Sequence, residues 1–221
     1  MTELTVGSIN FAPSQVAALG AAIGKDVPMF WYDIPGNIPR RPANDNYPRV
    51  VALTGAAGSG KSTAADYLIR HHGYERVKFA GPLKDMCRAI GMTESQIEGE
   101  SKEEPAAMLS GKTPRHAMQT LGTEWGRKCM GEDFWANLWL SRVKAILAFD
   151  GRVVVDDCRF PNEAEAVRKL GGVIIKLEGR GGIAGTHASE AGCGTWDGVV
   201  VNDGGLVELY AGVDEAVRRA A

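Results

Sequence analysis

The stretch "LTGAAGSGKST", Leu53 to Thr63, constrains the fold of this chain more than any other feature. It fits the pattern G-x-x-x-x-G-K-[ST] in full, with Gly55 and Gly60 as the fixed glycines and Lys61 and Ser62 closing the pattern. The stretch begins at the end of the apolar run "VVALT" and ends at the start of the helix-like segment "KSTAADYLIRHHG". A strand, a glycine loop and a helix in this order predict a phosphate-binding loop at a helix N-terminus.

The residue types of this loop suit the phosphates of a nucleoside triphosphate. Small residues let successive backbone N–H groups surround phosphate oxygens, a lysine reaches the β and γ phosphates, and a hydroxyl ligates Mg²⁺. The alternative is a glycine-rich turn with an incidental lysine. We expect Mg²⁺ as the cofactor and ATP or GTP as the ligand of Gly55, Gly58, Ser59, Gly60, Lys61, Ser62 and Thr63.

Beyond the loop, apolar strand-like runs alternate with helical segments, which is typical of an α/β protein. Strands are expected near residues 50–54, 76–80, 152–157, 173–179 and 198–202, and helices near 61–73, 82–90, 113–125, 133–149, 162–172 and 206–217. Asn162 and Glu165 are expected to cap the helix that follows the third strand. We therefore predict a parallel, roughly five-stranded sheet in a three-layer αβα sandwich. Residues 93–112 are polar and acidic and predict a mobile excursion.

Composition excludes several classes of protein. The chain has 221 residues, 44% of them hydrophobic, and a formal net charge of −2, so no general basic field predicts a nucleic-acid polymer or an anionic membrane as partner. The chain starts without a leader-like segment and lacks a long apolar run, so we expect a cytoplasmic location. Its four cysteines form no CxxC pair, and reduced, mostly buried thiols are expected.

Two neighbouring aspartates, Asp156 and Asp157, end the apolar run "RVVVDD". Carboxylates at the end of a buried strand commonly hold Mg²⁺ in phosphoryl-transfer enzymes. Adjacent side chains of a strand point to opposite faces, so one of the two is expected to face the metal. The alternative is that they cap the following turn.

Scattered cationic residues are candidates for binding a second anionic substrate. Arginine grips phosphate in a bidentate fork, although each such charge alone is usually a solvated surface group. Gln119 lies one turn after Arg115, where it could add a contact to a base edge. The expected cations are Lys84, Arg115, Arg127, Arg159 and Arg180. The aromatic residues Trp125, Phe134, Trp135 and Trp139 are interpreted as core residues rather than as a base platform.

The chain resembles the bacteriophage-type deoxynucleoside monophosphate (dNMP) kinases. The matching pieces are "LTGAAGSGKSTAADYL", "FAGPLKDM", "TPRHAMQTLGTEWGR", "FW", "VVVDDCRFPNEAEAVRKLGG", "HASE" and "VVNDGGLVEL", in the family's order over residues 50 to about 212. The resemblance implies a P-loop kinase fold and transfer of the γ-phosphate of ATP to a dNMP, with ATP and the dNMP as partners. It also divides the chain into an N-terminal extension or linker, 1–48, and a nucleotide kinase domain, 49–221.

The resemblance also implies residue roles. Lys61, Arg159 and Asp157 would be catalytic, with Asp157 and Ser62 at the metal. The substrate side would comprise Lys84, Arg115, Gln119, Arg127 and Arg159. We expect Arg180, His187 and Glu190 in a lid, with Arg115 and Arg127 as the other candidates for its arginine. Whether "HASE" touches the nucleotide or shapes the lid stays open.

Two alternatives remain at the level of sequence. The chain could be a P-loop kinase for another small molecule such as dephospho-coenzyme A, or a nucleotide-binding switch, although it has no N-K-x-D element for reading guanine. The accepted bases and the oligomeric state, including a homodimer, are left open by the sequence.

Overall fold

The computed structural model describes residues 5–6, 9–10, 46–179 and 192–221. These residues divide into two compact units, Met1–Val77 with Leu140–Ala221, and Lys78–Trp139. Each unit is described by itself. The predicted lid residues lie outside the described residues, as does most of the N-terminal extension, where only the paired strands β1 (Thr5–Val6) and β2 (Ile9–Asn10) are described.

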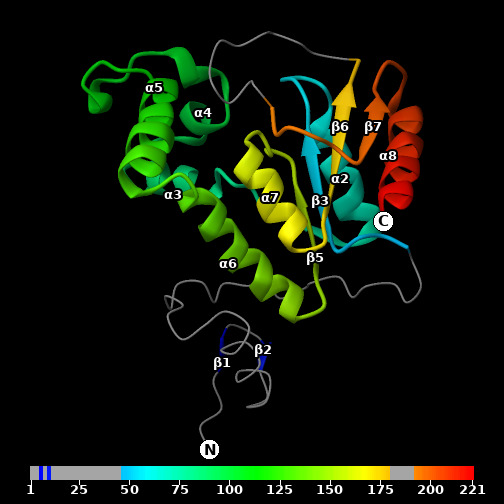
Figure 1. The fold of residues 1–221 in the computed structure, drawn as a ribbon. Coiled ribbons are helices and arrows are strands. Elements are labelled where there is room, and N and C mark those ends of the chain that lie inside the picture. The colour runs from blue at the N-terminus through cyan, green and yellow to red at the C-terminus, as the bar shows by residue number, and fades with distance from the viewer. Residues whose placement is uncertain (1–4, 7–8, 11–45, 180–191) are drawn as a thin grey trace, which may run out of the picture. The chain divides into compact units, whose positions relative to one another are not determined.

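A five-stranded sheet forms the centre of the first unit (Figure 1). All neighbouring strands are parallel, in the order β4-β5-β3-β6-β7, which confirms the predicted sheet. The strands are β3 (Val50–Thr54), β4 (Tyr74–Arg76), β5 (Arg152–Val155), β6 (Val173–Glu178) and β7 (Gly198–Val201). Because the strands are parallel, their carboxyl ends meet at one edge of the sheet.

The central strand β3 is buried along its whole length, as the unbroken apolar run "VVALT" predicts for a strand covered on both faces. It pairs with β5 through Val51 and Val154 and with β6 through Leu53 and Ile175. These four residues are completely buried. The core therefore lies directly beneath the glycine loop that follows Thr54.

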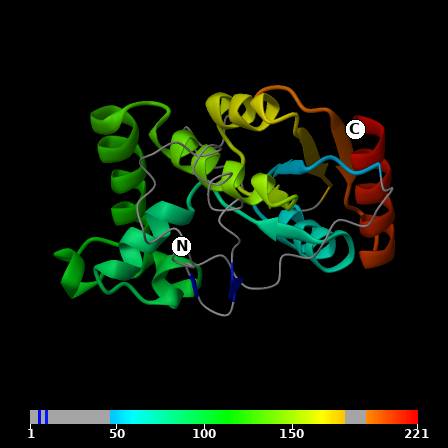
Figure 2. The same ribbon diagram turned by 90° about the horizontal axis from the view of Figure 1, so that it is seen from below.

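Helices cover both faces of this sheet, which confirms the three-layer architecture (Figure 2). The helices α2 (Lys61–His72) and α8 (Leu206–Ala220) contact each other on one face, and α7 (Pro161–Lys169) contacts β3 and β6 from the other. The helix α2 buries Ala64, Ala65 and Leu68 and ends at Gly73 in the left-handed region, φ 67°.

The start of α7 differs from the expectation. Glu163, not Glu165, is the capping carboxylate: its Oε2 accepts the backbone N–H groups of Arg159 at 2.8 Å and Phe160 at 3.1 Å. Phe160, one residue before the helix, takes the place predicted for Asn162. The first turn of α7 begins at a proline with φ near its helical value, so the helix starts earlier than the asparagine.

The strand β4 also lies earlier than the expected 76–80. It covers Tyr74–Arg76, and its last contact with the sheet is the bond from Val77 N–H to Val154 O at 3.0 Å. After this point the chain enters the second unit.

The second unit is helical. It contains α3 (Gly81–Ala89), α4 (Glu94–Ile97), the 3-10 turns η2 (Glu100–Glu103) and η3 (Ala107–Leu109), α5 (Pro114–Gln119), the π-helical η4 (Thr120–Met130) and the start of α6 (Phe134–Ala148). The predicted excursion over 93–112 is therefore wrong. Thr93 and Gln96 form a capping box at the start of α4, and Ile97 is fully buried in a core with Leu83 and Cys87.

The expected single helix from Thr113 changes from α to π geometry at Thr120. The indole N–H of Trp135 donates to Gly122 O at 2.9 Å, and a Cβ at Gly126 would lie 2.4 Å from the same nitrogen. Gly126 thus makes room for the indole ring against the π-helix, and Gly122 accepts its hydrogen bond. Trp135 and Trp139 are 4% and 1% exposed, which confirms that they are core residues, whereas Trp125 is 36% exposed, so its core assignment is wrong.

Two further features bear on how the chain is organised. Tyr47, just before the predicted boundary at residue 48, is buried and donates its hydroxyl hydrogen to Asp214 on α8. The domain boundary stays a prediction. In the described part of the chain, each helix is too short or too polar to cross a membrane.

Candidate functional site

The glycine loop joins β3 to α2 at the carboxyl edge of the sheet. Gly55, Gly58 and Gly60 all have positive φ, at 134°, 78° and 99°. A Cβ at Gly55 would lie 2.3 Å from Leu177 O, and a Cβ at Gly60 would lie 2.5 Å from the side-chain nitrogen of Asn202. The loop is therefore seated tightly on the ends of β6 and β7, where only glycine fits.

Lys61, the first residue of α2, folds its side chain back over this loop. Its Nζ donates to Gly55 O at 2.8 Å and to Ala56 O at 2.6 Å, with Ser59 Oγ 3.5 Å away. The ammonium group and the positive end of the α2 dipole thus share one place, which favours an anion there. Ser62 is exposed on the first turn of the helix.

The carboxyl end of β5 is linked to α2 through Arg76, a residue that sequence reasoning missed. Arg76 Nε lies 3.4 Å from the buried carboxylate of Asp156, and its terminal nitrogen donates to Ser62 O and to Asp66 Oδ1, both at 3.0 Å. Arg76 therefore ties the strand end to the first turn of α2.

Asp157 and Arg159 follow at alternate positions. Asp157 is half-buried, Arg159 is exposed, and Cys158 between them is 1% exposed. A hydrogen bond with Cys193, together with burial, raises the pKa of the Cys158 thiol. All four cysteines are free and only Cys129 is exposed, as expected.

The donor set fits a magnesium ion that is held partly by nucleotide. Mg²⁺ prefers oxygen ligands and usually takes one or two carboxylates, water and substrate phosphates instead of a cage of protein ligands. Within residues 46–179 and 192–221, no three His, Cys, Asp or Glu side chains gather as a metal cage. The hydroxyl of Ser62 and the carboxylate of Asp157 supply the oxygen types that Mg²⁺ prefers.

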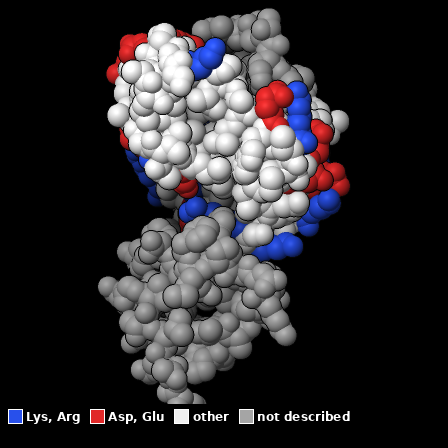
Figure 3. All heavy atoms as spheres, turned by 90° about the vertical axis from the view of Figure 1, so that its left-hand side faces the viewer, with Lys and Arg blue, Asp and Glu red and all other residues white. Residues whose placement is uncertain are grey.

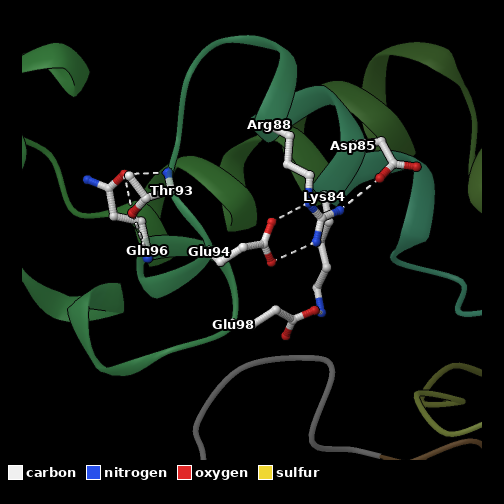
Figure 4. Close-up of polar contacts among 7 residues, drawn as sticks. All are labelled: Lys84, Asp85, Arg88, Thr93, Glu94, Gln96 and Glu98. Atoms are coloured by element: carbon white, nitrogen blue, oxygen red, sulfur yellow. Dashed lines mark hydrogen bonds and ion pairs between the residues drawn. The ribbon is translucent and has the colours of Figure 1, made fainter.

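In the second unit, Lys84 on α3 forms an ion pair with Glu98, 2.6 Å from Nζ to Oε1 (Figure 4). Burial alone would raise the pKa of Glu98, but the hydrogen bond and charge of Lys84, with the charges of Lys78 and Lys102, outweigh burial and lower it. One turn further along α3, Arg88 pairs with Glu94 and Asp85 at 2.6 and 2.8 Å. Acidic neighbours thus neutralise the cations of this helix.

The other substrate-side candidates lie on α5 and η4. Arg115 pairs with Glu103, and Arg127 donates to Glu132 O at 3.3 Å. Gln119 is exposed one turn after Arg115 on α5. The structure thus brings Lys84, Arg115, Gln119 and Arg127 into one unit.

On the face shown in Figure 3, blue and red side chains lie at the margins of a largely uncharged surface. The cationic residues of that face do not merge into a single basic field.

Comparisons with known proteins agree on one family. Residues 97–213 match the sequence profile described as deoxynucleotide monophosphate kinase. A protein of Acanthamoeba polyphaga mimivirus, which carries the provisional name deoxynucleotide monophosphate kinase, is 35% identical over 194 residues, covering 78% of this chain and 97% of the relative. The deoxynucleotide monophosphate kinase of Escherichia phage RB69 is 32% identical over 109 residues, or 47% of this chain and 44% of the relative.

The chain belongs to the deoxynucleotide monophosphate kinase family. The sequence signal for this family was the glycine loop together with "TPRHAMQTLGTEWGR" and "DDCRFPNEA". Within the kinase, Arg76 and Asn202 escaped sequence reasoning. Arg76 began the strand expected over 76–80 and Asn202 lies 143 residues from its partner Ser59, so no local pattern identified either.

The carboxylates around Arg76 allow a matched test of this kinase. Asp156 is 2% exposed and Asp66 is 48% exposed, while both contact the same guanidinium. Asp156→Asn leaves the buried side of Arg76 without its charge partner and should lower the free energy of unfolding by about 2 to 3 kcal/mol. Asp66→Asn should change it by less than about 1 kcal/mol.

Urea denaturation of both variants measures this difference. Equal losses of stability in the two variants would contradict the view that Asp156 and Arg76 form the link between β5 and α2.

Proposed function

We propose that this chain transfers the γ-phosphate of ATP to a deoxynucleoside monophosphate, giving ADP and the deoxynucleoside diphosphate. Membership of the kinase family carries the proposal, because a complete phosphate loop alone fits many nucleotide-binding proteins. The geometry of the loop agrees with ATP as the donor.

The loop is assigned to the donor nucleotide. Backbone N–H groups from Gly55 to Thr63 surround the β and γ phosphates, and Lys61 exchanges its contacts with Gly55 O and Ala56 O for phosphate oxygens. Mg²⁺ held by Ser62 and Asp157 would neutralise charge on the transferred group.

The chemical step needs little covalent help from the protein. An oxygen of the acceptor phosphate attacks the γ-phosphorus, that P–O bond forms, and the bond to the β–γ bridging oxygen breaks to leave ADP. The attacking phosphate is already ionised, so no strong base is required. Positive charge from Lys61 and Arg159 stabilises the charge that develops in the transition state.

The acceptor is assigned to Lys84, Arg115, Gln119 and Arg127, with Arg159 also contacting its phosphate. Lys84 and Arg115 are paired with glutamates in the structure. The Arg115–Glu103 pair is exposed and contributes little stability, so a phosphate can replace Glu103 at small cost. Arg180, His187 and Glu190 are assigned to a lid.

The surroundings of the reaction belong to the same proposal. We place it in the cytoplasm, where ATP and dNMPs are available. Homodimer formation and the absence of a nucleic-acid partner stay predictions.

A substrate panel tests the function. The purified protein, ATP and Mg²⁺ are combined with each dNMP or with dephospho-coenzyme A, and ADP release is measured. ADP formation should depend on one or more dNMPs and should be absent with dephospho-coenzyme A. Steady ATP hydrolysis that no dNMP changes would favour a nucleotide-binding switch instead, and activity with dephospho-coenzyme A alone would favour the other kinase.

Arg159 offers a test of catalysis without loss of folding. Its side chain is exposed, and its backbone N–H, which remains in any variant, is the group that Glu163 holds. Arg159→Ala should lower kcat by about 10³-fold, while the melting temperature stays within about 2 °C. Arg219→Ala, on the exposed side of α8, is the matched control and should retain full activity. An Arg159→Ala enzyme with near wild-type kcat would remove this residue from the mechanism.

The Mg²⁺ dependence of activity distinguishes the roles proposed for Asp156 and Asp157. Asp157→Asn removes a negatively charged oxygen ligand and should raise the Mg²⁺ concentration for half-maximal activity by about tenfold. Asp156→Asn should leave that concentration unchanged, because its carboxylate is already neutralised by Arg76. A shift in Mg²⁺ dependence in Asp156→Asn only would reverse the assignment.

A further inference from the structure

Asn202 connects the edge of the sheet to the phosphate loop. It follows the last residue of β7 and is 6% exposed. Its backbone N–H donates to Glu178 O at 2.7 Å, which extends the pairing of β6 and β7 by one bond. Its side-chain nitrogen Nδ2 donates to Ser59 O at 3.0 Å in a buried hydrogen bond. One residue is therefore fixed to the sheet by its backbone and to the loop by its side chain.

This hydrogen bond sets the orientation of one peptide unit. Ser59 O belongs to the peptide that joins Ser59 to Gly60. In a planar trans peptide, the carbonyl and the following N–H point in opposite directions. Because Ser59 O points toward Asn202, the Gly60 N–H points away from Asn202.

Such an orientation needs to be held, because this part of the loop is rich in glycine. Gly58 and Gly60 both have positive φ, and glycine passes between positive and negative φ at little cost. Ser59 is 1% exposed, so its carbonyl has little access to water if Asn202 is removed. A loop whose Ser59–Gly60 peptide rotates would present a carbonyl where a phosphate needs a donor.

The packing around Asn202 fixes its own side chain. A Cβ on Gly60 would lie 2.5 Å from Nδ2, and a Cβ on Gly179 would lie 3.0 Å from the backbone carbonyl of Asn202. The amide oxygen cannot replace the nitrogen, since two acceptor oxygens would face each other. Gly60 and the Ser59 carbonyl therefore hold the side chain, while Gly179 packs against the backbone of Asn202.

We propose that Asn202 is a positioning residue for ATP, which keeps the Gly60 N–H directed at the nucleotide phosphates by holding the Ser59 carbonyl. The proposal rests on the proposed function for the identity of the nucleotide. It goes beyond the family assignment, which gives no role to the residue after β7.

Two variants at Asn202 remove the hydrogen bond to Ser59 O, one without and one with an added negative charge. Asn202→Ala removes the donor, and Asn202→Asp keeps the size but turns an oxygen toward Ser59 O. Both retain the backbone bond to Glu178. Binding of ATP with Mg²⁺, measured by calorimetry without any acceptor, should weaken by about tenfold in Asn202→Ala and by more in Asn202→Asp. Asn46→Asp, a charge-matched change at an exposed asparagine, should bind ATP as the unaltered chain does.

Steady-state kinetics and NMR distinguish a role in ATP positioning from a purely structural role of Asn202. In Asn202→Ala, KM for ATP should rise by about the same factor while KM for the dNMP changes less than twofold. The Gly60 amide signal should shift on ATP binding in the unaltered chain and shift less in the variant.

Three results would overturn the proposal: unchanged ATP affinity in folded Asn202→Ala, equal weakening of ATP and dNMP, or a variant that unfolds at the assay temperature. The last two would make Asn202 a structural residue only. Because ATP binding is measured without an acceptor, a chain that binds ATP but phosphorylates no dNMP would refute the proposed function and leave the role of Asn202 open to the same test.

Discussion

The structure depends on the close contact between the glycine loop and the carboxyl ends of β6 and β7. The loop positions 55 and 60 have no room for a side chain, because a Cβ at Gly55 would meet Leu177 O and one at Gly60 would meet the side chain of Asn202. The parallel sheet brings these strand ends beneath the loop, so the loop takes its shape from the sheet as well as from its own residues. Gly55 thus lets the loop approach the backbone of β6, and Gly60 lets it approach the side chain of Asn202.

The cationic candidate residues of the two units have different partners. In the first unit, Lys61 donates to the carbonyl oxygens of Gly55 and Ala56, while Arg76 lies beside the buried carboxylate of Asp156. In the second unit, Lys84 and Arg115 are paired with glutamates. The Arg115–Glu103 pair is exposed, and a pair of this kind is exchanged at small cost. Under the proposed function, the first unit contributes the loop and Lys61 to the donor, and the second unit contributes cations to the acceptor.

Sequence patterns predicted the features that depend on neighbouring residues. The glycine loop, the five strands and most helices were found because period, caps and breakers lie within a few positions of each other. Features that depend on contacts outside the local sequence were missed: Asn202 bonds to Ser59, 143 residues away, and Gly126 leaves room for the ring of Trp135 from the next helix. The polar segment 93–112 was misjudged because one buried residue, Ile97, anchors it.

The fate of the γ-phosphate tests the central claim most directly. The chain is incubated with Mg²⁺, a dNMP and ATP labelled with ³²P in the γ position, and the products are separated by chromatography. Phosphoryl transfer predicts that the label appears in the deoxynucleoside diphosphate in an amount equal to the ADP formed. Label found only in inorganic phosphate, with the dNMP unchanged, would contradict a kinase reaction.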